Sequence, residues 1–113
     1  MHKLLIFLKR KPGMSLLEFR DYYEGRHVPL IMNYMKEPTR YFRRFLEPTP
    51  EMPEMDFDVI TELWFTERAT ADFVINMMTK DSMPADVIAD EHQFLDRSKS
   101  RFHLVTEHET ELG

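Results

Sequence analysis

A histidine within an aromatic stripe is the feature of this sequence that most clearly suggests chemistry. Apolar and aromatic residues recur at steps of three or four, which places them on one face of a helix: Leu16, Phe19, Tyr23, His27, Leu30 and Tyr34. A histidine gains and loses a proton near neutral pH, so this position predicts a general acid or base beside a pocket. The alternative is a packed histidine bonded to a carbonyl, because histidine is intermediate in burial.

The residues around His27 define the helix that must position it. Ser15 and Glu18 have the spacing of a capping box, which predicts a helix over about 16–34. Pro29 cannot donate a backbone hydrogen bond, so we expect a kink there that opens space beside the imidazole.

Four apolar runs have the length and composition of β-strands: residues 3–9, 40–46, 57–65 and 101–107. In the third run, alternation places Phe57, Val59, Thr61 and Leu63 on one face and Ile60, Glu62 and Trp64 on the other. The proline-rich segment 47–56 is expected to form an exposed loop.

Two further helices are expected between the third and fourth strands. The first covers about 68–78, with Thr66 as its cap, and the second runs from Pro84 to about Leu95. In the second, Ile88, His92 and Leu95 are expected to share a face, and the acidic side chains are expected in solvent or near the edge: Asp86, Asp90, Glu91 and Asp96.

The element order βαββα(α)β predicts an α+β fold, a ferredoxin-like sandwich in a single domain over 1–113. Helices then cover one face of the sheet, and the other face is too apolar to stay wet. We therefore expect a homodimer in which two sheets meet face to face as a dimeric α/β barrel. The alternative is a monomer with a partly apolar sheet.

Composition narrows the classes of partner. The formal net charge of −5 disfavours nucleic acid and anionic membrane as main partners. There are no cysteines, no run long enough to span a bilayer and no recognisable signal peptide, which together suggest a cytoplasmic protein. Only three glycines are present, without a phosphate-binding loop, so nucleotides are not expected.

Several stretches resemble the EthD domain family. Residues 9–30 carry its Pro-Gly turn, Phe-Arg pair and late His-x-Pro, and similar segments follow at 60–65, 90–96 and 102–112. The resemblance implies the dimeric α/β-barrel superfamily, which includes cofactor-independent oxygenases, cyclases, isomerases and haem-binding enzymes. The pattern is also similar to methylmuconolactone methylisomerase, except that the loop 47–56 lacks the histidine which that enzyme uses.

The resemblance implies a pocket between the helices and the sheet. The catalytic residues would then be His27, Tyr41 and His92, with His27 as acid or base and the others holding an oxyanion. The ligand would be bound by Tyr34, Glu62, Trp64, Phe73 and Met77. Structural roles stay open as alternatives: Tyr34 and Trp64 as core aromatics, Glu62 as the partner of an arginine such as Arg43, and His92 as a surface residue.

The function expected from these residues is cofactor-independent proton transfer on an aromatic, lactone or polyketide-like metabolite, as in an isomerase, cyclase or lyase. One alternative is an EthD-type oxidoreductase or oxygenase, with a link to haem left open, and another is a non-catalytic accessory protein that binds a small molecule. No metal is expected, because His27, Glu62 and His92 would bind one only if three separate elements converged.

Overall fold

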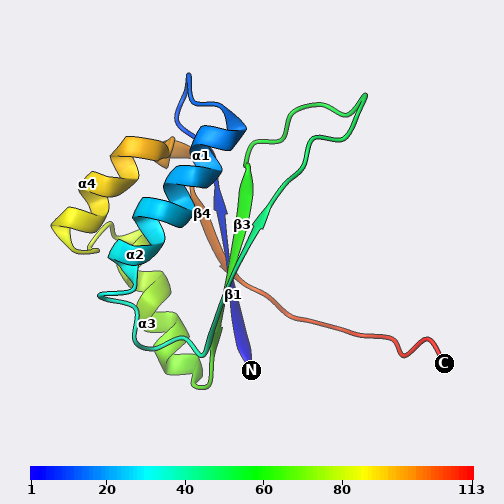
Figure 1. Ribbon diagram of the computed structural model, residues 1–113. Helices are drawn as coiled ribbons and strands as arrows, with labels where there is room; N and C mark the ends of the chain where they lie inside the picture. The colour runs from blue at the N-terminus through cyan, green and yellow to red at the C-terminus, as the bar shows by residue number, and fades with distance from the viewer.

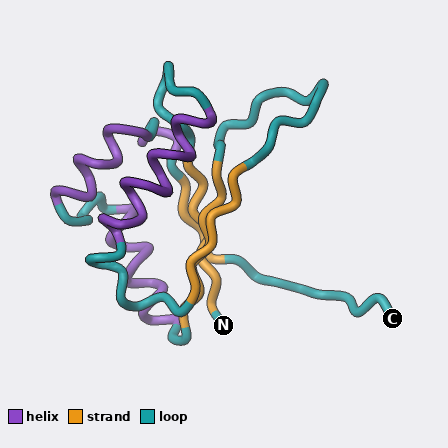
Figure 2. Tube along the Cα trace, viewed as in Figure 1, coloured by secondary structure: helices purple, strands orange, loops and turns teal.

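The computed structural model describes residues 1–113 and shows one antiparallel sheet with helices on a single face (Figures 1 and 2). The strands are β1 (His2–Leu8), β2 (Arg40–Phe45), β3 (Val59–Phe65) and β4 (Arg101–Leu104). Their order across the sheet is β2-β3-β1-β4, so the first and third strands are central. This is the ferredoxin-like α+β fold, and the prediction of fold class is confirmed.

The helices follow the first and third strands, as expected. They are α1 (Leu16–Tyr22), the π-helical turn η1 (Tyr23–His27), α2 (Val28–Ile31), α3 (Arg68–Thr79), α4 (Ala85–Phe94) and the 3₁₀ turn η2 (Arg97–Lys99). None of the helices is long and apolar enough to cross a bilayer.

The helix that carries His27 begins as predicted and then departs from regular geometry. Ser15 Oγ accepts from the Glu18 amide at 3.0 Å, and the Ser15 amide donates to the Glu18 carboxylate at 3.0 Å, which completes the capping box. In place of a simple kink at Pro29, η1 precedes it, and the Val28 amide donates to the Tyr23 carbonyl, five residues back. The wider turn relieves the conflict between the proline ring and a regular α-helical ladder.

The two faces of the sheet follow strand alternation. The buried side chains of β1 and β3 point toward the helices and pack with Phe19, Tyr23 and Phe94. They are Leu4, Ile6, Leu8, Val59, Thr61, Leu63 and Phe65. The opposite, open face carries half-buried residues with no helix over them: Leu5, Phe7, Phe42, Ile60, Glu62 and Trp64.

Three local predictions are wrong. Phe57 does not continue the inward face of β3, because the strand begins at Val59 and the Phe57 ring packs on Phe7 of the open face, with centroids 5.0 Å apart. Thr66 does not cap α3, whose N-cap is Glu67 without a side-chain hydrogen bond. The fourth strand ends at Leu104 rather than at 107.

Two segments project on the open side of the sheet. After β4 the chain runs away from the body as an extended arm, and the β2–β3 connection reaches out above it (Figure 1). The connection is irregular, as predicted, and is anchored at its base. Asp58 accepts from the Arg10 amide at 2.9 Å and from its guanidinium at 2.8 Å, and Glu54 accepts from Lys9 and Arg10, each at 2.9 Å.

Candidate active site

A cavity of about 500 Å³ lies between the helices and the sheet. Most of the residues that line it are apolar, and methionines contribute Met35, Met77, Met78 and Met83. Its lining includes the buried polar side chains of His27, Tyr23 and Thr61 and the half-buried side chain of Tyr41. A largely apolar cavity with a few convergent polar groups is the usual form of a small-molecule site.

His27 is held through one ring nitrogen. Its Nδ1 lies 2.8 Å from Asp90 Oδ2, and the other carboxylate oxygen, Oδ1, accepts from the Tyr22 hydroxyl at 2.7 Å. A carboxylate accepts hydrogen bonds, so the neutral imidazole places its proton on Nδ1 and its lone pair on Nε2.

The second nitrogen of His27 remains available. Nε2 makes no hydrogen bond within the protein, yet no buried side-chain nitrogen or oxygen lacks a partner. Nε2 therefore has accessible surface, even though the residue as a whole is only 7% exposed, and His27 lines the cavity. A base in this position can reach a ligand.

Aromatic rings fix the orientation of the imidazole. The His27 ring packs edge-on against Tyr23, with centroids 5.2 Å apart, and at a tilt of 46° against Phe94 of α4, with centroids 5.0 Å apart. Tyr23 opens η1 and His27 closes it, so the π turn brings both side chains to the cavity. Single π turns are frequent at functional sites.

The hydroxyls of Tyr23, Tyr41 and Thr61 form a hydrogen-bonded cluster in the cavity, which we call the hydroxyl cluster. Tyr23 Oη lies 2.9 Å from Tyr41 Oη and 2.6 Å from Thr61 Oγ1. Burial raises the pKa of Tyr23 to about 12, and burial together with the neighbouring Tyr23 raises the pKa of Tyr41 further. Both tyrosines are therefore protonated at neutral pH and can donate hydrogen bonds.

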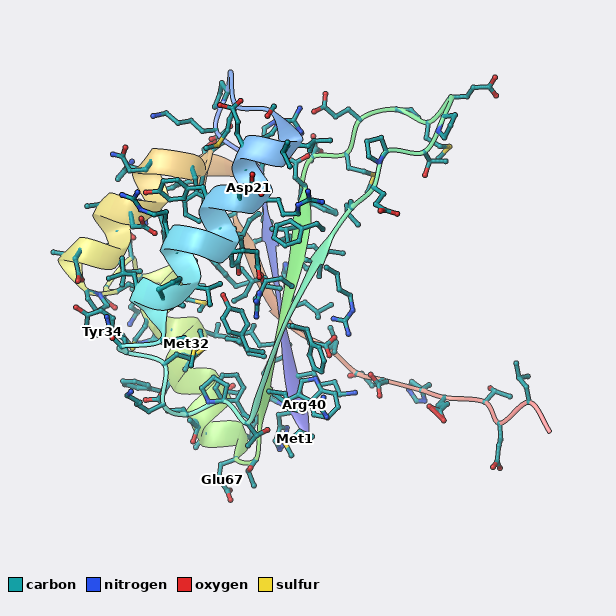
Figure 3. The ribbon with its side chains drawn as sticks, viewed as in Figure 1. Met1, Asp21, Met32, Tyr34, Arg40 and Glu67 are labelled. Atoms are coloured by element: carbon teal, nitrogen blue, oxygen red, sulfur yellow. The ribbon has the colours of Figure 1, made fainter.

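Five of the eight predicted site residues line the cavity: His27, Tyr34, Tyr41, Phe73 and Met77. Tyr34 lies beyond the C-terminal end of α2 and is 41% exposed, and its hydroxyl donates to Asp86 of α4 (Figure 3). Phe73 is more exposed still, at 58%. The roles assigned to these five residues remain predictions.

Glu62 and Trp64 do not line the cavity, contrary to expectation. They alternate with Thr61 and Leu63 along β3, so they lie on the open face. There the Trp64 indole donates to Glu62 at 2.6 Å, and the arginine near Glu62 is Arg44, at 3.4 Å. Arg43, the expected partner, points to the helix side and binds Glu24.

His92 is exposed and does not line the cavity either. The expected stripe through Ile88 and His92 is wrong because α4 buries Val87 and Phe94 instead. This rotation turns Asp90 inward, where the sequence pattern predicted a solvated carboxylate. The steps from Val87 to Asp90 and from Asp90 to Phe94, of three and four residues, are the signal that could have identified it.

His27, Glu62 and His92 do not converge, because Glu62 lies on the open face of the sheet and His92 lies on the surface. No group of three or more His, Cys, Asp or Glu side chains is arranged to hold a metal ion.

Comparisons with known proteins agree with the fold. The sequence profile of the EthD domain matches residues 11–98. The structure is similar to that of At3g17210 from Arabidopsis thaliana, with a TM-score of 0.62 at 16% identity over 99% of this chain and 100% of the other. An EthD family protein of Bacillus halodurans has a TM-score of 0.62 at 18% identity, over 96% of this chain and 100% of the other. No curated protein sequence matches the chain significantly.

Proposed function

The chain belongs to the EthD domain family, and from this premise we propose that it is an enzyme that moves a proton on a small cyclic carbonyl or phenolic metabolite. The reaction class is that of an isomerase, cyclase or lyase, and His27 is the acid and base. The observation that carries this proposal is the pairing of His27 Nδ1 with Asp90 while Nε2 remains available in an apolar cavity.

The first step is removal of a proton from carbon next to a carbonyl. The Nε2 lone pair of His27 takes the proton, and the C–H electron pair moves toward the carbonyl, whose oxygen gains negative charge. Asp90 accepts from Nδ1 throughout, which orients the ring and stabilises the imidazolium that forms.

The Tyr41 hydroxyl stabilises the developing oxyanion. Tyr41 donates to that oxygen, Tyr23 holds Tyr41 through its hydroxyl, and Thr61 in turn holds Tyr23. A fixed donor in an apolar cavity stabilises charge more than the same donor does in water. His27 then returns the proton to another carbon or to a leaving oxygen, which completes an isomerisation or an elimination.

The test does not require the natural substrate to be identified first. A panel of lactones, cyclic ketones and 1,3-diketones is incubated in D₂O, and NMR follows protein-dependent exchange of C–H for C–D. We expect exchange for at least one compound and a loss of about 10²- to 10⁴-fold in His27→Gln. The matched control is His92→Gln, on the surface, which should exchange at the rate of the unaltered protein.

The same experiment distinguishes an enzyme from a non-catalytic binding protein. Ligand binding without exchange, or full exchange in His27→Gln, would contradict proton transfer by His27 and favour a binding protein. The oxidoreductase alternative and a cytoplasmic location remain predictions.

We also propose that two copies pair through the open face of the sheet. Its aromatic residues are only half-buried, and a group of exposed apolar side chains on one face commonly marks an interaction site. The arm after β4 and the β2–β3 connection project on the same side, where they would reach a second copy (Figure 1).

Trp64, the single tryptophan, lies on this face and reports directly on pairing. Dilution should change its emission in step with the mass measured by sedimentation, and Phe42→Glu should abolish both changes. A concentration-independent monomer would contradict the proposal.

A further inference from the structure

We infer that the cavity selects an uncharged ligand that presents a neutral oxygen acceptor, and that it rejects carboxylates of the same shape. This inference names the substrate class of the proposed enzyme and so rests on the proposed function for its biological meaning. It depends on the charges and hydroxyls that line the cavity, and these can be tested by binding alone.

The first argument concerns the cation at the rim of the cavity. Arg97 is the only lysine or arginine that lines it. Its Nε donates to Glu91 at 3.0 Å, Nη1 donates to Asp81 at 3.3 Å, and Nη2 donates to the other oxygen of Asp81. Three of its five N–H groups are used, and two protein carboxylates already balance its charge, so Arg97 offers a ligand carboxylate little uncompensated positive charge.

The second argument concerns the carboxylates that line the cavity. Glu37 lines the cavity as well, so three carboxylates stand against one guanidinium: Glu37, Asp81 and Glu91 against Arg97. A fourth carboxylate, Asp90, lies directly behind His27. The net charge of this part of the lining is therefore negative, which disfavours the approach of an anion.

The third argument comes from counting hydroxyl protons. Tyr23, Tyr41 and Thr61 have three hydroxyl protons, and the two hydrogen bonds among them use two. Whichever way the bonds run, one O–H is left to donate, and each of the three side chains lines the cavity. One donor suits a ketone, lactone or phenol oxygen.

An ionised carboxylate would be poorly compensated in this cavity. It would lose its hydration and gain one hydroxyl donor, with no unpaired cation within the lining. A neutral ketone loses little hydration and is satisfied by the same donor. Discrimination should therefore arise from the charge of the ligand more than from its shape.

The experiment compares acetophenone with benzoate, which are close in shape and differ in charge at pH 7. Chemical shifts of the ¹⁵N-labelled protein give both dissociation constants. We expect acetophenone to bind at least about tenfold more tightly, a difference of about 1.4 kcal/mol. Benzoate binding as tightly as acetophenone, or neither compound shifting the resonances of cavity residues, overturns the inference.

A double variant tests whether the charges in the lining cause this selectivity. Asp81→Asn with Glu91→Gln frees Arg97 and removes two negative charges, so benzoate affinity should rise about fivefold or more while acetophenone affinity changes little. The matched control, Asp72→Asn, removes a carboxylate of α3 that does not line the cavity, and should leave both affinities unchanged. An unchanged ratio in the double variant also overturns the inference.

These outcomes are independent of the exchange test. Selective binding with no C–D exchange by the unaltered protein, or with full exchange in His27→Gln, would refute the catalytic role of His27 alone. Exchange that depends on His27, without selectivity for the neutral ligand, would refute the ligand class alone.

Discussion

The two faces of the sheet are built by alternate residues of the same strands, and they carry different polar groups among their apolar side chains. The helix side carries neutral hydroxyls and an imidazole in an apolar cavity. The open side carries cations above aromatic rings: Lys3 Nζ lies 4.3 Å from the Trp64 ring centroid, and the Arg40 and Arg44 guanidinium carbons each lie 4.9 Å from that of Phe42.

This difference assigns separate tasks to neighbours in the sequence. Thr61 belongs to the hydroxyl cluster in the cavity, whereas Glu62 accepts a hydrogen bond from Trp64 on the opposite face of the sheet. Substitutions one position apart should therefore affect different properties, with the helix side governing stability and chemistry and the open side governing association.

The largest expected difference is between two phenylalanines. Phe94 is fully buried beneath His27, Tyr22 and Tyr23, so Phe94→Ala should lower the free energy of unfolding by about 3–5 kcal/mol. Phe42→Ala on the open face should cost about 1 kcal/mol or less within one chain, and should chiefly weaken pairing. Urea unfolding at several protein concentrations measures the effect of each substitution. If both lowered the free energy of unfolding equally at high dilution, the two faces would not have separate roles.

A second difference is expected at alkaline pH. Burial raises the pKa of Tyr23 from 10.0 to about 12, so the folded state favours the neutral phenol. Its contribution is fully present below about pH 10 and is lost as pH rises through 12, by roughly 2–3 kcal/mol. Urea unfolding between pH 9 and 12 should show a shallower decline in Tyr23→Phe. The open face has no tyrosine, so Phe42→Ala should leave the slope unchanged.

A third prediction concerns two aspartates of α4. Asp90→Asn should reduce C–D exchange by roughly 10- to 100-fold and alter its pH profile, because an amide no longer favours the tautomer with the Nε2 lone pair. Asp86 accepts from the Tyr34 hydroxyl and the Val87 amide and makes no hydrogen bond to His27, so Asp86→Asn should retain most of the exchange rate. If both variants lost activity equally, with the same pH profile, Asp90 would not be a positioning residue.

The smallest effect is expected from an ion pair of the open side. Lys3 lies 2.9 Å from Glu107, whose side chain is 61% exposed. Glu107→Gln should therefore change the free energy of unfolding by less than about 1 kcal/mol, and the change should shrink in high salt. Chemical denaturation at low and high salt measures it, and a large salt-independent loss would show that the arm is packed more firmly than its exposure indicates.

The fold could be predicted from the sequence because alternation and capping signals are local. Ser15 with Glu18 marks the start of α1, and the alternation over β3 separates Thr61 from Glu62 without any tertiary information. The same kind of local pattern places His27 on the inward face, where the structure has it.

The site was harder to predict because its partners meet only in three dimensions. Asp90 is one of several acidic residues in α4, and the pattern did not show which one turns toward α1. The resemblance points to Glu62 and Trp64, although their own alternation places them opposite Thr61. The position of His92 is hard to predict because two competing stripes on a short helix differ by a single residue.

The π turn gives this helix one residue more than a regular ladder between Tyr23 and Val28 would need. Gly25 lies inside the turn, and its α-carbon faces open space, since no heavy atom lies within 4 Å of the position that a β-carbon would take there. Deleting that one codon would shorten the turn toward ordinary α-helical spacing and leave the segments on either side close to their present register. Evolution could thus gain or lose the present setting of His27 through a single insertion or deletion, without rebuilding the core.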